Sequence, residues 1–238
     1  LIDSVCTTCG QCLSVCPTGA ISIKSEGNST TKEVDTTCPY CGVGCGITAQ
    51  VDSKQQITAM LDNPLNESSK GMLCVKGRFG FKYIHHKDRL KQPLIRKNGI
   101  LTESSWEEAI EYVGDQLSIY RGAEFATLCS AKATNEDGYI QQKFARTVMA
   151  TNNIDHCTRL CHSPSVEAML ESLGSGATSN SYIDYEEAGC LLIVGSDTNS
   201  NHPVAAARMR KAVVEKGAKL IIINPRRIEM CDFADLWL

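Results

Sequence analysis

Thirteen cysteines occur in 238 residues, and eight of them fall into two closely spaced groups. The first group is Cys6, Cys9, Cys12 and Cys16, followed by Pro17; the second is Cys38, Cys41 and Cys45, with Cys74 further along. Such short spacings let successive thiolates converge on one cubane of iron and sulfide. A disulfide framework would instead spread its cysteines over a small, loop-rich chain. The two groups therefore predict iron–sulfur clusters and electron transfer.

The first group has the spacing of one half of a two-cluster bacterial ferredoxin. In such proteins the first three cysteines of a motif bind one cluster and the fourth binds the other. No partner motif precedes Cys6. We therefore expect Cys6, Cys9 and Cys12 to need a fourth ligand from a preceding segment, and Cys16 to serve a second cluster. A zinc knot is the alternative, but zinc does not require this spacing.

The second group, in the segment CPYCGVGC, has glycines between its cysteines. Gly42 and Gly44 let the backbone turn sharply and bring amides near the sulfides. We interpret the group, with Cys74, as a [4Fe–4S] site; a structural zinc site is the alternative. Lys76 follows closely, where a cation would raise the cluster potential and contact a second, anionic cofactor. An ordinary surface lysine is the other interpretation.

A further cysteine stands beside a histidine, in Cys161-His162, ahead of a predicted helix at 164–173 that starts with Pro164. A position just before a helix N-terminus favours the thiolate form. His162 is a candidate proton acceptor near neutral pH. The spacing alone is a weak signal, because an isolated Cys-His pair is more often structural than catalytic.

Strands and helices alternate after residue 100. The predicted strands are 126–129, 190–194 and 219–223. One predicted helix starts at 106, and the others span 138–149, 164–173 and 203–216. The helix at 203–216 has Pro203 in its first turn and Gly217 as its stop signal, and Ser105 with Glu108 form a capping box for the helix that starts at Trp106. This order predicts an α/β fold with a parallel βαβ sheet covered by helices on both faces.

Polar loops follow two of the predicted strands. One runs from Gly195 to His202, and the other contains Asn224 and Arg226. Ligands of parallel sheets bind at the carboxyl ends of the strands. There helix amides and Arg226 or Arg227 would suit a pyrophosphate, and Asp197 would accept a hydrogen bond from a ring amine or sugar hydroxyl. Since no G-x-G-x-x-G motif is present, an ordinary NAD site is unsupported. A polar loop without a ligand is an equal alternative.

These features divide the chain into a partial ferredoxin-type module (1–24), a linker (25–32), a [4Fe–4S] domain (33–100) and an α/β region (101–238). The net charge of −3 and the lack of a long basic run give no reason to expect nucleic acid. No stretch approaches the ~20 apolar residues of a membrane span. Because iron–sulfur assembly favours a reducing cytosol, we expect a cytoplasmic protein.

Together the motifs resemble the catalytic (alpha) subunit of molybdenum- or tungsten-dependent formate dehydrogenase, one of the bis-molybdopterin guanine dinucleotide oxidoreductases. The resemblance rests on the ferredoxin motif, CPYCGVGC, CVKGRFG, FKYIHHKDRLKQPLIR, TNNIDHCTRLCHSPSV, SDTNSNHP and INPRRIE, in this order over nearly the whole chain. CPYCGVGC alone marks only the superfamily. The segment RLCHSPSV narrows the resemblance to formate dehydrogenases, because similar nitrate reductases have a sequence like RLCM at this place. The chain looks like an N-terminal portion of such a subunit.

The resemblance implies a role for each site residue. Cys161 matches the protein ligand of molybdenum or tungsten, His162 matches the histidine that assists C–H cleavage, and Lys76 matches a lysine between cluster and pterin. The residues that match the ligands of the proximal [4Fe–4S] cluster are Cys38, Cys41, Cys45 and Cys74. Those that fall where the family holds guanine dinucleotide are Gly195, Asp197, Asn199, Asn201, His202, Asn224 and Arg226.

The implied activity is the two-electron interconversion of formate and CO2, with electrons relayed through [4Fe–4S] clusters to iron–sulfur, diaphorase or hydrogenase subunits. The sequence does not choose between molybdenum and tungsten. One alternative is another molybdopterin oxidoreductase, such as a cytoplasmic nitrate reductase. Another is a non-catalytic iron–sulfur electron-transfer subunit, against which the Cys161-His162 pair argues.

Overall fold

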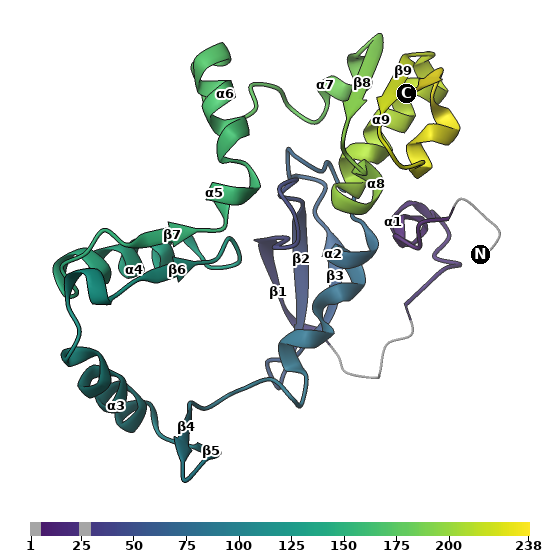
Figure 1. Cartoon of the computed structure of the whole chain (residues 1–238). Helices are drawn as coiled ribbons and strands as arrows, with labels where there is room; N and C mark the ends of the chain where they lie inside the picture. The colour runs from purple at the N-terminus through teal and green to yellow at the C-terminus, as the bar shows by residue number, and fades with distance from the viewer. Residues whose placement is uncertain (1–5, 24–29) are drawn as a thin grey trace. The chain divides into compact units, whose positions relative to one another are not determined.

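A computed structural model describes residues 6–23 and 30–238 of the protein (Figure 1). They form two compact units: the residues up to Lys87 together with Asn180–Leu238, and Asp88–Ser179. The α/β region expected from residue 101 therefore contributes to both units. Of the predicted linker 25–32, residues 25–29 lie outside the described residues, and a strand begins at Thr30.

The first sheet of the larger unit is antiparallel, with the order β1-β2-β3. Its strands are β1 (Thr30–Thr37), β2 (Gly46–Asp52) and β3 (Ile57–Asp62). β1 is exposed along its length, whereas Ile47 and Ala49 of β2 are buried in a core with Val43, Met60 and Leu73. Two cysteines of the turn between β1 and β2 belong to the same core. The sheet thus fixes the position of that turn.

The second sheet of this unit is parallel, with the order β10-β9-β8. Its elements are β8 (Cys190–Val194), the connecting helix α9 (Pro203–Lys216), β9 (Lys219–Ile223) and β10 (Leu236–Trp237). Gly217 follows α9 with a φ of +71°, the left-handed conformation that ends helices. The predicted parallel βαβ unit is confirmed.

Burial alternates along β8. Leu191 and Ile193 are buried in a core with Ala206 and Ala212 of α9, whereas Leu192 and Val194 are 61% and 60% exposed. Within the described residues α9 covers one face of this sheet, and the face that carries Leu192 and Val194 is exposed. Helices on both faces stay a prediction. An uninterrupted apolar run does not distinguish burial on one side from burial on two.

Short helices complete the larger unit: α1 (Gln11–Val15), α2 (Val75–Phe79), α7 (Asp184–Glu187), α8 (Thr198–Asn201) and the 3₁₀ helices η1 (Gly80–His85) and η3 (Glu229–Phe233). Arg208 of α9 forms a buried ion pair with Glu186 of α7 and donates to the carbonyl oxygen of Ser69 at 2.8 Å. This pair ties α9 to α7 and to the loop that leads to Cys74.

The smaller unit contains β4 (Leu94–Lys97), β5 (Ile100–Glu103), α3 (Trp106–Ser118), η2 (Gly122–Glu124), β6 (Thr127–Cys129), α4 (Asn135–Thr147), β7 (Ile154–His156), α5 (Thr158–Cys161) and α6 (Ser163–Leu173). β4 and β5 form a hairpin, and β6 and β7 are parallel and joined through α4. Ser105 accepts a hydrogen bond from the Glu108 amide, as predicted for the start of α3.

Helix α4 begins at Asn135, three residues before its predicted start. Thr134 and Asp137 form a capping box there, in which each side chain accepts from the backbone amide of the other residue. Among the helices of the described residues, none has the length and apolar character needed to cross a membrane.

Candidate functional site

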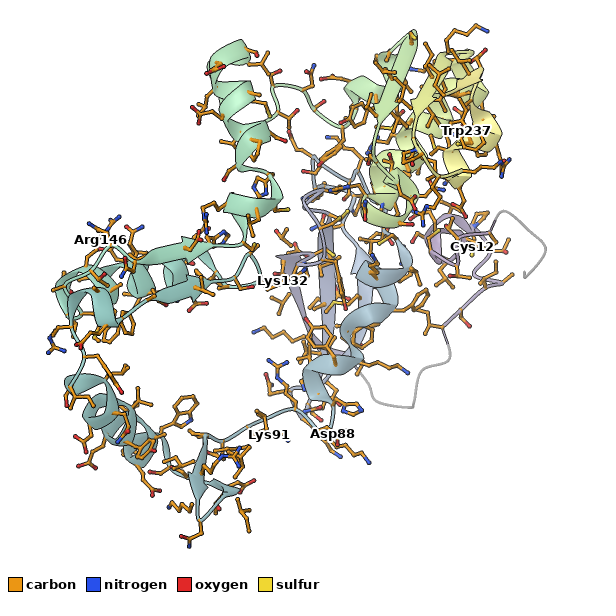
Figure 2. All side chains as sticks on the ribbon, in the orientation of Figure 1. Cys12, Asp88, Lys91, Lys132, Arg146 and Trp237 are labelled. Atoms are coloured by element: carbon orange, nitrogen blue, oxygen red, sulfur yellow. The ribbon has the colours of Figure 1, made fainter. Side chains whose placement is uncertain are left out.

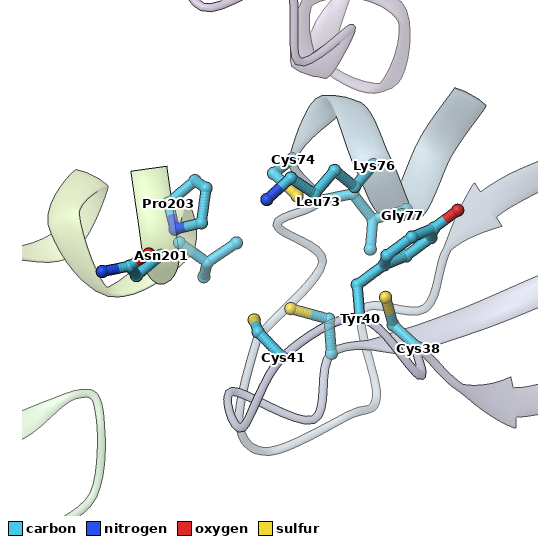
Figure 3. Close-up of a pocket in the computed structure, with 11 residues that line it drawn as sticks. Cys38, Tyr40, Cys41, Leu73, Cys74, Lys76, Gly77, Asn201 and Pro203 are labelled. Atoms are coloured by element: carbon cyan, nitrogen blue, oxygen red, sulfur yellow. The ribbon is translucent and has the colours of Figure 1, made fainter. Parts of the chain in front are cut away.

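The four cysteines of the second group meet at one small cavity (Figure 3). Cys38, Cys41 and Cys45 come from the turn between β1 and β2, and Cys74 is the N-cap residue of α2. The amide of Cys38 donates to the carbonyl oxygen of Cys45 at 2.8 Å, which closes the turn. In Figure 3 the sulfur atoms of Cys38 and Cys41 face the space beneath Cys74 and Lys76. Residues far apart in the sequence thus supply one thiol-lined site.

A glycine allows α2 to approach this turn. A Cβ atom at position 77 would lie 3.4 Å from the Cys38 sulfur and 3.4 Å from Leu73 Cδ2. That distance is the close limit of ordinary van der Waals contact, so the space between α2 and the turn admits a small side chain at most. The glycine of CVKGRFG therefore has a packing role beside a candidate ligand.

The four cysteines of this cavity would repel one another if all were thiolates. Burial, followed by the charges of the neighbouring Cys38, Cys41 and Cys74, raises the pKa of the Cys45 thiol to about 12. Four thiolates can therefore share this site only with a positively charged group bound among them. Across the part of the chain that the structure describes, no three Cys, His, Asp or Glu side chains converge closely enough to hold a single metal ion.

Lys76 connects the thiol-lined cavity to the polar loop after β8. Its Nζ donates to the carbonyl oxygen of Ser200 at 3.2 Å, and its side chain lines the cavity together with Asn201 and Pro203 (Figure 3). A cation at this place can stabilise negative charge on either side of it. Lys76 thus lies between the second cysteine group and the polar loop after β8. Its role between a cluster and a second cofactor stays a prediction.

The predicted dinucleotide residues meet at the carboxyl ends of β8 and β9. Asp197 caps α8, accepts from Ser200 Oγ at 2.9 Å and pairs with Arg226 at 2.7 Å. Asn224 Oδ1 accepts from the Arg226 amide at 3.0 Å. The side chain of Arg226 is 72% exposed, so its ion pair with Asp197 contributes little and can exchange for a phosphate.

The remaining residues of this group lie around the same loops. Gly195 has a φ of +63°, and the Asn199 side-chain amide donates to Glu229. Trp237 closes the neighbouring loop, since its Nε1 donates to the carbonyl oxygen of Asn224 at 2.9 Å (Figure 2). His202 turns toward the cysteine turn, because a Cβ on Gly42 would lie 4.0 Å from His202 Nε2.

The N-terminal cysteines surround α1. The Cys6 sulfur accepts from the Thr8 amide at 3.4 Å, and the Cys9 sulfur accepts from the Gln11 amide at 3.5 Å, as thiolates do in cluster-binding loops. Cys12 lies within α1 (Figure 2), and Cys16 is its C-cap residue. Hydrogen bonds from the side chain and backbone of Thr18 lower the pKa of the Cys16 thiol to about 7. These groups suit metal-bound thiolates.

Cys161 belongs to the smaller unit, at the end of α5. His162 follows as the N-cap residue of α6, and Pro164 lies in the first turn of that helix, as predicted. The thiol of Cys161 is exposed, as a ligand of an added cofactor must be. Asp155 and Arg159 pair across the turn, and Arg159 holds the pKa of the Asp155 carboxyl below its ordinary value by hydrogen bonding.

Comparisons with known proteins agree with this arrangement. The family described as molybdopterin oxidoreductase matches residues 89–238, its Fe4S4 domain matches 31–86, and a 4Fe-4S binding domain matches 1–22. The chain belongs to the molybdopterin oxidoreductase family. The matched domains confirm the predicted cofactor types, [4Fe–4S] clusters and pterin-held molybdenum or tungsten.

Several relatives of this molybdopterin oxidoreductase are named formate dehydrogenases. It is 46% identical over 207 residues to F420-dependent formate dehydrogenase 1 subunit alpha of Methanococcus maripaludis, and 45% identical over 207 residues to the corresponding subunit of Methanocaldococcus jannaschii. These matches cover 86% and 87% of this chain and 30% of each relative. A putative formate dehydrogenase of Bacillus subtilis is 38% identical over 214 residues, which cover 87% of this chain and 22% of the relative. The chain thus spans about 30% of the length of its first relatives.

Acetylene hydratase from Pelobacter acetylenicus is a solved structure with the same fold. It superposes with a TM-score of 0.66 at 19% identity, over 87% of this chain and 29% of that one. The predicted fold class is thereby confirmed.

Several contacts near the site were not predicted. Arg78 and Gln11 join the two cysteine groups, and His156 Nδ1 accepts from the Thr158 amide at 3.1 Å at the start of α5. His85 accepts from the Ile57 amide at 3.1 Å through its Nε2. The motif CVKGRFG contains Arg78, but a motif does not say which distant residues its side chains reach.

Proposed function

We propose that the whole protein is the catalytic subunit of a formate dehydrogenase, which interconverts formate and CO2. The observation that carries the proposal is the identity of 46% and 45% to two subunits of that name, over 86% and 87% of this chain. The pairing of Cys161 with His162 ahead of α6 supports it, because this is the segment by which the sequence resembles formate dehydrogenases.

The chain's own residues take distinct parts in the proposed reaction. The Cys161 thiolate holds the metal, and His162 holds the proton that formate releases with two electrons on becoming CO2. When bound, the pterin-held metal supplies the two-electron acceptor. Lys76 lies between the cysteine cavity and the polar loop, and Asp197, Asn224 and the residues around them bind the dinucleotide.

The electrons leave singly through the two cysteine groups. The proposed recipients are further iron–sulfur subunits, or a diaphorase or hydrogenase subunit, in the cytoplasm. A reducing compartment keeps thirteen cysteines available as thiols and cluster ligands.

Two substrates and two cysteine variants test the proposal. The purified enzyme should reduce a viologen dye with formate, should fail to oxidise the reduced dye with nitrate, and should contain molybdenum or tungsten by elemental analysis. Cys161→Ala should lower formate turnover on the order of 10³-fold or more while its clusters stay reducible. The matched control is Cys157→Ala, which removes another exposed thiol one turn earlier.

Two results would refute the proposal. Nitrate-dependent turnover without formate activity would identify a different oxidoreductase. Full formate activity in Cys161→Ala would show that Cys161 is not a ligand of the metal.

A further inference from the structure

Two side chains that are not cysteines join the N-terminal cysteine group to the segment around Cys74. The first is Arg78 of α2, whose side chain is 1% exposed. Its Nε donates to the carbonyl oxygen of Cys9 at 3.2 Å, and its Nη2 donates to Ser14 Oγ at 3.0 Å and to Asp62 Oδ1 at 3.1 Å. A buried guanidinium needs a countercharge and acceptors for its donors. Two of these acceptors lie in the N-terminal group, so Arg78 holds that group against α2 and β3.

The second side chain is that of Gln11, at the start of α1. Its Nε2 donates to the carbonyl oxygen of Gly71 at 3.0 Å, and its Oε1 accepts from the Leu73 amide at 3.2 Å. One amide group thereby satisfies a donor and an acceptor of the backbone that leads into Cys74. Gln11 lies between Cys9 and Cys12, so this bridge joins the two cysteine groups at adjacent residues.

The contact is close enough to exclude a side chain at position 10. Gly10 has a φ of +73°, and a Cβ there would lie 2.6 Å from Arg78 Cδ and 2.8 Å from Phe79 Cζ. Cys9 and Cys74 also line one cavity of about 360 Å³, together with Gln11 and Leu73. The two cysteine groups are therefore neighbours, held by packing as well as by hydrogen bonds.

We infer that Gln11 and Arg78 are positioning residues for electron transfer, which fix the separation between a cluster on Cys6, Cys9 and Cys12 and a cluster on the second cysteine group. In each transfer one electron leaves the reduced cluster of one group and enters the oxidised cluster of the other. The rate of this step falls exponentially with the distance between clusters. The inference rests on the proposed function for the direction of electron flow, and the fixed separation itself does not depend on the substrate.

The test uses the anaerobically purified enzyme with its clusters, in three variants. Gln11→Met keeps the length of the side chain and removes both hydrogen bonds. Arg78→Lys keeps the charge beside Asp62 and loses the planar set of donors that reaches Cys9 and Ser14. The control, Gln116→Met, replaces an exposed glutamine on α3.

Three measurements follow for each variant. Iron and sulfide analysis reports cluster content. Electron paramagnetic resonance of the dithionite-reduced enzyme reports the magnetic interaction between the clusters, which falls with the cube of their separation. Hydrogen–deuterium exchange reports the protection of residues 6–16. None of these requires formate.

Gln11→Met and Arg78→Lys should retain wild-type iron, lose part of the magnetic splitting and exchange faster over residues 6–16, while Gln116→Met matches wild type. Formate-driven reduction of acceptors beyond the N-terminal cluster should slow about tenfold or more, since small displacements strongly affect positioned reactants. Unchanged splitting and exchange in both variants would overturn the inference, as would loss of cluster iron from both. If the splitting changes in the variants but the wild-type enzyme is inactive with formate, the inference holds and the proposed function is refuted.

Discussion

Replacing Glu186 by glutamine should destabilise the larger unit far more than the same change at its sequence neighbour Glu187. Glu186 pairs with Arg208, whose side chain is 5% exposed, and with Lys211 at 2.8 Å. Burial raises the pKa of Glu186, but hydrogen bonds from Lys211 and Arg208 outweigh it and hold the pKa below its ordinary value. Glu187 pairs with Lys216 at 2.7 Å, and both of these side chains are largely exposed.

The expected magnitude follows from what the substitution leaves behind. Glu186→Gln leaves the buried Arg208 guanidinium without a countercharge, and its Nε atom already has no hydrogen-bond partner. Breaking one side of a buried pair costs about 3–5 kcal/mol. For a domain of this size the midpoint of thermal unfolding should fall by roughly 6–20 °C, at about 2–4 °C per kcal/mol. Glu187→Gln should lower the free energy of unfolding by about 1 kcal/mol or less, because exposed ion pairs contribute no more than that.

The pH dependence of this difference has a definite sign. A carboxyl whose pKa is lowered by folding stabilises the protein above its unfolded pKa, and the contribution is lost as the pH falls through the folded value. The difference between the two variants should therefore stay constant from about pH 6 to pH 8, well above an ordinary glutamate pKa.

The assay is scanning calorimetry of both variants with iron release followed in parallel, because α9 and the Ser69 loop border the cysteine cavity. The double variant Glu186→Gln/Arg208→Met should recover most of the lost stability, since it removes the unpaired charge as well. Equal unfolding midpoints for Glu186→Gln and Glu187→Gln would refute the reasoning, and so would a double variant less stable than Glu186→Gln alone.

Three further substitutions test the candidate site. Gly77→Leu should lose cluster iron, because a side chain that extends beyond a Cβ would have to displace the Cys38 sulfur and Leu73, both 3.4 Å from that Cβ, and overpacking costs about 1–3 kcal/mol; Gly114→Leu, whose Cβ meets nothing within 4 Å, should retain iron. Lys76→Ala should slow dye-linked turnover roughly tenfold, or about 1.4 kcal/mol, with unchanged metal content, and equal rates would make Lys76 a bystander. His156→Phe removes the acceptor for the Thr158 amide, so hydrogen exchange of the amides of residues 157–162 should become faster. The lost hydrogen bond should lower the local stability by about 1 kcal/mol. His156→Asn, which keeps an acceptor, should restore the protection.

Local signals in the sequence predicted much of the larger unit. The bounds of α9 and β9 agree with the prediction, because Pro203 and Gly217 act through their own backbone conformations. The start of α4 was missed, since its capping box uses Asp137 in place of the usual glutamate and precedes the apolar residues of the helix. Cysteine spacing predicted both groups, because their ligands lie within short loops.

Contacts between distant segments could not be predicted in this way. The guanidinium of Arg208 finds Glu186 and Ser69 through a fold that brings α7, α9 and a loop together, and no spacing in the sequence encodes that meeting. The same holds for Gln11, whose partners lie 60 and 62 residues away. The partners of such side chains can be identified only once the positions of the backbone groups that bind them are known.

Helix α2 shows why the short motif CVKGRFG serves several parts of the site at once. Successive residues of a helix point about 100° apart, because a turn takes about 3.6 residues. Lys76 reaches the carbonyl oxygen of Ser200 in the polar loop, Gly77 admits the Cys38 sulfur, and Arg78 reaches Cys9 in the N-terminal group. Three consecutive residues thus face the polar loop after β8, the second cysteine group and the N-terminal cysteine group. A change of one residue in the length of this helix would rotate all three contacts together, so the spacing of the motif and the relative placement of the two cysteine groups are a single structural constraint.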